Sequence, residues 1–165
     1  MYPATGVIIA EEYLDRWLLY MTSQLSPRSH ERYTEIVKKN LVPALGAICL
    51  TKLRSRHTAE AYAKALISGR RNGKGGLSAS TVVYMHRVLT QAVAQAVARH
   101  ELVRNEVAAV KPPKVERKQM KVLDMDATAT VIEATGDTTL FVPILRGVTT
   151  GMRRGEILAP RRSGR

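Results

Sequence analysis

The sequence has little cysteine, little acidic charge and no long hydrophobic run, and each shortage excludes a class of protein. Cys49 is the single cysteine, so no disulfide can form within the chain, and a reducing cytoplasm is the simplest location. The longest uncharged, mostly apolar run covers residues 41–50, and Pro43 and Gly46 interrupt it. A membrane span needs about 18 apolar residues, so we expect no transmembrane segment.

The N-terminus also lacks the features of a secretory signal. Its apolar patch, residues 7–10, is short, is followed at once by Glu11 and Glu12, and has no basic residue before it. The chain has 165 residues, of which 45% are hydrophobic. That is enough for one ordinary domain with a packed core and a second small piece.

Acidic residues are outnumbered by basic ones, 14 against 26, which gives a formal net charge of +12. This excess favours a polyanionic partner, either nucleic acid or an anionic membrane surface. The alternative is a basic protein whose charges are merely solvated. Two segments concentrate the charge: residues 111–121 and residues 153–165 each hold five basic residues against one acidic residue.

Periodic apolar residues predict helices in the first half of the chain. The first helix covers residues 9–24. Ser26 and Pro27 suit the N-cap and the first position of a second helix, which Pro43 and Gly46 are expected to end. The apolar stripe of this second helix, and hence its expected core contribution, is Tyr33, Ile36, Val37 and Leu41.

Two further helices complete a predicted four-helix unit. Thr58 can cap a third helix that stops near Gly69, and Ser78 can cap a long fourth helix that reaches about His100. Short loops between such helices are typical of a bundle, so residues 8–100 predict one compact helical unit.

After the fourth predicted helix the composition of the chain changes. Residues 105–121 predict a linker, because the double proline at 112–113 cannot continue a helix and the charge density is high. Beyond it, Asp124 or Asp126 can cap a short helix, and residues 138–150 predict a second, apolar helix.

The next residues carry a motif. Residues 150–158 read T-G-x-R-x-G-E-I-L, which resembles the first catalytic box of the tyrosine recombinases, the phage integrase family. Segments upstream agree with this resemblance: 26–46 resembles the second helix and its P-x-L-G turn, 77–82 the start of the fourth helix, 111–113 the linker, and 122–123 the entry to the catalytic domain.

The resemblance implies a mainly α fold. It consists of a four-helix SAM-like core-binding domain at residues 8–104, a basic interdomain linker at 105–121, and a helical stub of the α+β recombinase catalytic domain at 122–165. The implied function is site-specific DNA recombination and integration. The implied partner is double-stranded DNA at recombination or attachment sites, on which full-length relatives assemble as tetramers.

The resemblance implies no cofactor, no metal, no membrane partner and no small-molecule substrate. We expect a cytoplasmic, nucleoid-associated protein of a bacterial or phage-like mobile element.

In such an enzyme, two arginines, a lysine and histidines stabilise the scissile phosphate, and a late tyrosine forms a 3′-phosphotyrosyl intermediate. Arg153 matches the first arginine, and Glu156 is expected to hold or cap it. No tyrosine follows Tyr84 and no histidine follows His100, so the second arginine box and the nucleophile are missing. Residues 159–165 also depart from the family, which continues into a β-hairpin.

We therefore expect a truncated or frameshifted fragment that cannot cleave DNA. The alternative is a non-catalytic DNA-binding regulator that occupies recombination sites. A helix-turn-helix repressor is disfavoured, because the motif at 150–158 has no role in one. The apolar helix at 138–150 would lack packing partners, so a protease-resistant core of about residues 8–105 is expected.

Two polar stripes at helical spacing predict the DNA contacts, although a solvated face is the alternative for each residue. Arginine and glutamine can read base edges, whereas serine and tyrosine suit phosphates. The expected DNA-binding residues are Arg28, Arg32 and Lys39 on the second helix, Arg70, Arg71 and Lys74 in a glycine-rich loop, Ser78, Ser80, Thr81, Tyr84, Arg87 and Gln91 on the fourth helix, and Lys111, Lys114, Arg117 and Lys118 in the linker.

Overall fold

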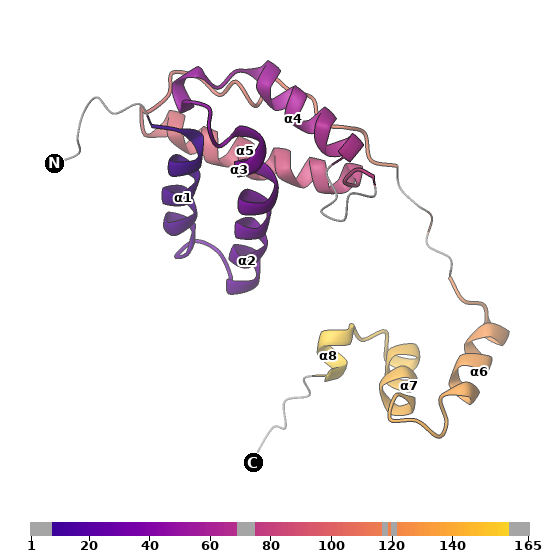
Figure 1. The fold of residues 1–165 in the computed structure, drawn as a ribbon. Helices are drawn as coiled ribbons and strands as arrows, with labels where there is room; N and C mark the ends of the chain where they lie inside the picture. Colours follow the sequence, from indigo (N-terminus) through magenta and orange to yellow (C-terminus); the bar gives the residue numbers. More distant parts are fainter. Residues whose placement is uncertain (1–7, 69–74, 117–118, 120–121, 159–165) are drawn as a thin grey trace, which may run out of the picture. The chain divides into compact units, whose positions relative to one another are not determined.

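The computed structural model describes residues 8–68, 75–116, 119 and 122–158. It forms two compact units, the first ending at Glu116 and the second following it. The first unit contains α1 (Ala10–Met21), α2 (Pro27–Ile36), a π-helical turn η1 (Val37–Leu41), α3 (Val42–Leu45), a short 3-10 turn η2 (Leu50–Lys52), α4 (Ser55–Ser68) and α5 (Ala79–Ala98) (Figure 1). The second contains α6 (Met125–Ala134), α7 (Phe141–Thr150) and α8 (Arg154–Leu158).

The caps that the sequence predicts do start α2 and α5. Ser26 Oγ accepts a hydrogen bond from the backbone N–H of Ser29 (3.4 Å), and Pro27 is the first residue of α2. Ser78 Oγ accepts one from the N–H of Thr81 (3.2 Å) at the start of α5. With α2, η1 and α3 forming one continuous helical path, the first unit has four helical segments, and the prediction of a mainly α, four-helix fold is confirmed.

The sequence suggested that Pro43 helps to end the second helix, but the helical path continues through this residue. The backbone N–H of Val42 donates to the carbonyl oxygen of Val37, five residues back, so η1 changes the hydrogen-bond register just before the proline. Pro43 then lies in the first turn of α3, where its missing N–H costs nothing. The helical path ends at Gly46, and burial of Val37 and Leu45 holds it against the core.

The prediction that Thr58 caps the third helix is also wrong. α4 begins three residues earlier, at Ser55, and Thr58 lies in its first turn. The side chain of Thr58 is fully buried, and its Oγ1 has no hydrogen-bond partner among the residues that the structure describes. The first turn of α4 faces the core, and Thr58 therefore serves there as a small buried side chain.

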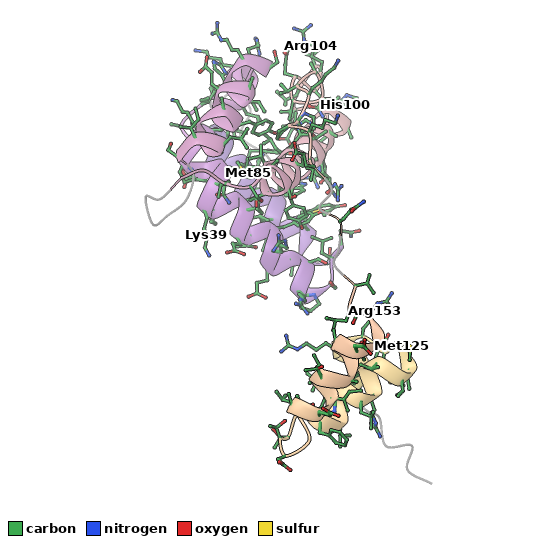
Figure 2. The ribbon with its side chains drawn as sticks, turned by 90° about the vertical axis from the view of Figure 1, so that its right-hand side faces the viewer. Lys39, Met85, His100, Arg104, Met125 and Arg153 are labelled. Atoms are coloured by element: carbon green, nitrogen blue, oxygen red, sulfur yellow. The ribbon has the colours of Figure 1, made fainter. Side chains whose placement is uncertain are left out.

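The core lies between α1 and α5, with α2, α3 and α4 around it. Tyr13 Oη donates to the carbonyl oxygen of Ala92 (2.8 Å), and Trp17 Nε1 donates to Gln95 Oε1 (2.8 Å), so α1 is tied to α5 by polar as well as apolar contacts. Figure 2 shows Met85 in the interior of this unit, where it is 1% exposed. The apolar residues of α5 that face this core are buried, among them Val82, Met85, Leu89, Ala92, Val93 and Ala96.

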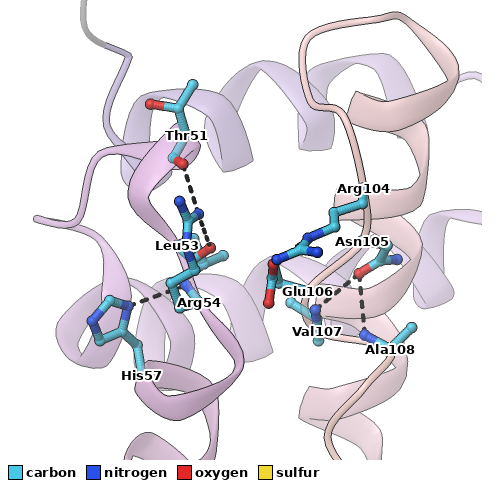
Figure 3. A network of polar contacts seen from close by, with 9 residues as sticks. All are labelled: Thr51, Leu53, Arg54, His57, Arg104, Asn105, Glu106, Val107 and Ala108. Atoms are coloured by element: carbon cyan, nitrogen blue, oxygen red, sulfur yellow. Dashed lines mark hydrogen bonds and ion pairs between the residues drawn. The ribbon is translucent and has the colours of Figure 1, made fainter.

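The chain after α5 stays attached to the first unit. Asn105 Nδ2 donates to the carbonyl oxygen of Thr90 (3.1 Å). Asn105 Oδ1 accepts from the N–H groups of Val107 (3.1 Å) and Ala108 (3.2 Å) (Figure 3). Val107 is fully buried in the same core, and Val110 packs against it. The beginning of the segment assigned to the linker is thus packed on the helices.

Over the residues that the structure describes, the second unit contains three short helices, none of whose residues is buried. Asp124 Oδ1 accepts from the N–H of Ala127 (2.8 Å), which identifies Asp124 as the cap of α6. The apolar helix expected from residue 138 begins instead at Phe141. Pro143 has no backbone N–H, so it fits the first turn of a helix but not a later one. The backbone N–H of Thr138 donates to the carbonyl oxygen of Thr135 in a turn before the helix.

Candidate nucleic-acid interface

The polar stripe of α5 is exposed as its spacing predicts. Ser80, Arg87 and Gln91 are exposed and Tyr84 is half-buried, while the buried residues of the same stretch are Val82, Met85, Val88 and Leu89. α2 packs beside α5, and its own polar side, with Arg28 and Arg32, is exposed as well. Two helices therefore present neighbouring polar stripes on one unit.

Direct side-chain contacts join the two stripes. The guanidinium carbon of Arg32 lies 5.0 Å from the ring centroid of Tyr84, a cation–π contact from α2 to α5. The ring of Tyr84 meets that of Tyr33 edge to face, with centroids 5.9 Å apart. Tyr33 Oη donates to Gln91 Oε1 (3.1 Å). The α2–α5 surface is formed by Arg28, Arg32, Tyr33, Ser80, Tyr84, Arg87 and Gln91.

Tyr33 is the member of this surface that the sequence analysis missed. Its spacing placed it in the apolar stripe of the second helix, and its ring does stack on Trp17, with centroids 5.9 Å apart and planes at 18°. Its hydroxyl nevertheless reaches the exposed Gln91. A tyrosine at the edge of an apolar stripe, rather than a phenylalanine, is the signal that such a polar contact was available.

Burial raises the pKa of Tyr33, and the neighbouring Tyr84 raises it further, while Arg87 lowers it in part. The hydroxyl therefore keeps its proton at neutral pH and acts as a hydrogen-bond donor. Behind it, Trp17 is 1% exposed and is not available for base stacking, as expected of a core residue.

Lys39 is on the surface of the first unit (Figure 2), but its charge is partly neutralised. Lys39 Nζ lies 2.7 Å from Glu35 Oε1, one turn earlier, and Lys38 Nζ lies 2.7 Å from Asp15 Oδ2. An exposed i,i+4 pair such as Lys39–Glu35 stabilises a helix by about 0.3–0.5 kcal/mol. Lys39 is thus a weaker candidate for a phosphate contact than Arg28 or Arg32.

The side chains of Ser78 and Thr81 hydrogen-bond at the N-terminus of α5. Ser78 Oγ accepts the N–H of Thr81 and lies 2.9 Å from its Oγ1. Lys111 and Lys114 lie exposed in an extended segment of the first unit, and no carboxylate in the described part of the chain pairs with them. The remaining expected contacts, Arg70, Arg71, Lys74, Arg117 and Lys118, lie outside the described residues.

Arg153 immediately precedes α8, in the second unit (Figure 2). Gly151 ends α7 with a φ of 67°, a left-handed conformation that favours glycine, and so explains the glycine of the motif. Glu156 Oε2 accepts the backbone N–H of Arg153 (2.8 Å), and its Oε1 lies 3.7 Å from the Arg153 guanidinium. Glu156 is therefore a capping residue. The Arg153 side chain is 89% exposed, and its guanidinium can meet a phosphate.

In the described part of the chain, no group of three or more His, Cys, Asp or Glu side chains is arranged to hold a metal ion. The helices described here include none with the length and hydropathy to span a bilayer.

Residues 11–66 match the phage integrase N-terminal SAM-like domain. An integrase of Saccharopolyspora erythraea is 28% identical over 151 residues, which cover 88% of this chain and 33% of that protein. The chain spans about a third of the length of the curated relatives that it matches.

Solved proteins with similar folds include the following two. The phage integrase SAM-like domain from Moorella thermoacetica is 32% identical, with a TM-score of 0.54, over 73% of this chain and 97% of that domain. Lambda integrase, solved as a dimer bound to a COC′ core site, has a TM-score of 0.73 at 19% identity, over 88% of this chain and 40% of that one. It has also been solved as a tetramer bound to a Holliday junction. With the helical unit, its cap residues and the motif around Arg153, these likenesses show that the chain belongs to the phage integrase family of tyrosine recombinases.

Proposed function

We propose that the α2–α5 surface binds double-stranded DNA at recombination or attachment sites, as the DNA-binding part of a site-specific integrase. The observation that carries this proposal is the contact chain from Arg32 through Tyr84 and Tyr33 to Gln91, which makes one surface of two helices. The major groove admits an α-helix, and arginine and glutamine pair there with base edges. α5 thus supplies base-reading groups, and α2 supplies cations for the flanking phosphates.

The net charge of +12 supports a polyanionic partner. Lambda integrase, a neighbour in fold, is bound to DNA in its solved structures, which supports DNA as that partner. Its tetramer on a Holliday junction supports the same assembly for a longer protein that contains this chain together with a complete catalytic domain. Association with nucleoid DNA follows from the same proposal.

The basic residues after α5 would add contacts to the DNA backbone. Lys111 and Lys114 are exposed and positively charged, and they lie in the part of the first unit that precedes the second unit in the sequence. Each phosphate that a lysine neutralises contributes about −0.9 to the slope of log affinity against log salt. The contacts assigned to Arg117 and Lys118, and to the loop at 70–74, remain predictions.

Arg153 is proposed to contact the scissile phosphate, because a guanidinium matches two phosphate oxygens and stays charged at neutral pH. A polypeptide of these 165 residues has no tyrosine after Tyr84 and no histidine after His100. We therefore propose that this polypeptide binds DNA without cleaving it. That behaviour would also suit a regulator that occupies recombination sites, which is the second candidate function.

The binding proposal is tested by fluorescence anisotropy with labelled duplexes from a candidate attachment site, at 50–300 mM salt. Arg87→Ala on α5 is compared with Arg56→Ala, an exposed arginine of α4 that lies outside the α2–α5 surface. We expect Arg87→Ala to weaken binding about tenfold, and Arg56→Ala to stay within about twofold of the unmodified chain. Equal loss in both variants, or affinity independent of salt, would contradict the proposal.

The cleavage proposal needs a separate assay. A nicked suicide duplex traps a covalent adduct between protein and DNA when a tyrosine attacks the phosphate. We expect no adduct that survives SDS with this polypeptide. An adduct would show that another residue supplies the nucleophile, while leaving the binding proposal intact.

A further inference from the structure

The side chain of Gln91 is held in one orientation by a residue from another helix. Tyr33 Oη on α2 donates to Gln91 Oε1 on α5 at 3.1 Å, across 58 residues of sequence. Gln91 is exposed, whereas Tyr33 is half-buried. In this contact Oε1 faces Tyr33, so the Nε2 end of the amide faces away from it.

Tyr33 is itself fixed by the core. Its ring stacks on Trp17, which is 1% exposed and whose Nε1 donates to Gln95 Oε1 at 2.8 Å. Its edge also meets the ring of Tyr84. The position of the hydroxyl is therefore set by buried residues, and Gln91 takes its orientation from the folded unit.

The orientation has a chemical consequence for base recognition. With Oε1 turned towards Tyr33, the Nε2 amide group lies on the other side of the planar amide and presents two hydrogen-bond donors. Guanine offers two acceptors in the major groove, N7 and O6, whereas adenine offers one acceptor and one donor. A glutamine that pairs with both groups of adenine must also present its carbonyl oxygen to the base.

We propose that Tyr33 is a specificity-determining positioning residue: by engaging Oε1 of Gln91, it leaves the amide to act as a donor, so Gln91 selects guanine over adenine in the DNA site. This inference rests on the proposed function, because it assumes that α5 lies in the major groove. Tyr33 touches Gln91 and acts through it.

The test is selection from a randomised duplex library with the 165-residue chain, followed by affinity measurements on single-base variants of the selected site. Gln91→Ala identifies the base position that Gln91 reads. At that position we expect the unmodified chain to prefer guanine over adenine by about fivefold or more. In Tyr33→Phe, the amide is free to turn, and we expect this preference to fall below about twofold or to reverse towards adenine.

Two controls separate positioning from general damage. Tyr20→Phe removes a tyrosine hydroxyl on α1, where the ring lies under Arg99 at 4.6 Å and away from Gln91, and it should keep the guanine preference. Gln91→Glu keeps an oxygen acceptor for Tyr33 and removes the donor, and it should lose the preference. Thermal unfolding shows whether each variant is folded, and Tyr33→Phe retains the ring that stacks on Trp17.

The outcomes are distinct. If the unmodified chain selects no sequence and binds without salt dependence, the proposed function fails and this inference fails with it. If it selects a site but adenine is preferred, or Gln91→Ala changes no position, or Tyr33→Phe keeps the full guanine preference, the inference alone is overturned. A folded Tyr33→Phe variant that still binds DNA in a salt-dependent way but with relaxed base preference supports it.

Discussion

The amide of Asn105 donates to the carbonyl oxygen of Thr90 at 3.1 Å and so ties the chain after α5 back onto α5. The same side chain accepts the N–H groups of Val107 and Ala108, which turns the backbone and places Val107 in the core. One asparagine therefore decides where the packed unit ends and the exposed basic segment begins. Lys111 and Lys114, which are proposed to contact the DNA backbone, follow directly.

Asn105→Ala should release this segment. The variant leaves the two backbone N–H groups without their acceptor and removes the tie to Thr90, so we expect a loss of about 1–2 kcal/mol in the free energy of unfolding. Urea denaturation followed by Trp17 fluorescence measures it, since Trp17 is the only tryptophan and is buried in this unit. Arg104→Ala is the matched control.

The side chain of Arg104 is 78% exposed and pairs with Glu106, so its removal should change the free energy of unfolding by less than about 0.5 kcal/mol. Equal effects of the two substitutions would show that Asn105 does not anchor the segment.

Ser78 and Ser80 should separate stability from DNA binding. Ser78 caps α5, so Ser78→Ala is expected to cost about 1 kcal/mol of folding free energy. Ser80 is exposed two residues later, and Ser80→Ala should leave the free energy of unfolding within about 0.5 kcal/mol while weakening DNA binding. Thermal melts and anisotropy on the same preparations provide both readouts. A Ser78→Ala variant as stable as the unmodified chain would rule out the capping role.

Local signals in the sequence were sufficient to predict most of the first unit. Serine before a helix, apolar residues at helical spacing and the polar stripe of α5 are properties of neighbouring residues, and all three appear in the structure. Passage of the helical path through Pro43 was not predictable in this way. It depends on the π-helical turn, and burial of Leu41 and Leu45 against other helices stabilises that turn.

The candidate site also contains residues that local signals predict and residues that depend on contacts between helices. Arg87 and Gln91 were predictable because spacing alone puts them on the polar side of α5. The role of Tyr33 was not, because it requires α2 to lie against α5 so that a hydroxyl at residue 33 meets an amide at residue 91. Likewise, the composition of residues 105–121 predicts a linker, and only the contacts of Asn105 show that its first residues pack on the core.

The two units should differ in protection from hydrogen exchange. The helices of the first unit surround a core with fully buried residues, whereas none of the residues in α6, α7 and α8 is buried. Large apolar side chains such as Leu140, Val142 and Leu158 are more than half exposed. We expect amides of α1 and α5 to exchange only through global unfolding and amides of α6–α8 to exchange within seconds. Mass spectrometry of exchange in the intact chain measures both.

Limited proteolysis should give the same division, with a resistant fragment that ends beyond Val107 and cleavage within residues 122–158. Comparable protection of both units would mean that the apolar side chains of α7 are covered in solution, and would overturn this expectation.

Tyr13 should make the stability of the first unit sensitive to high pH. Burial, together with a smaller contribution from the nearby Glu101, raises the pKa of Tyr13 to about 12, against the opposite effects of Arg99 and Arg16. An unfolded tyrosine titrates near pH 10. Because the folded pKa is the higher one, the stabilising contribution is complete below about pH 10 and is lost as the pH rises from 10 towards 12.

The free energy of unfolding should therefore be nearly constant from pH 7 to 9 and fall steeply above pH 10, as the phenolate form cannot donate to the carbonyl oxygen of Ala92. Tyr13→Phe should start about 1 kcal/mol less stable at pH 8 and show a shallower fall above pH 10, because the titrating group is gone. Tyr62 is also buried with a raised pKa, so some alkaline dependence remains in the variant. Urea denaturation at pH 8, 9.5 and 11 gives the difference between the two slopes, and identical slopes would show that Tyr13 is not a group whose ionisation opposes folding.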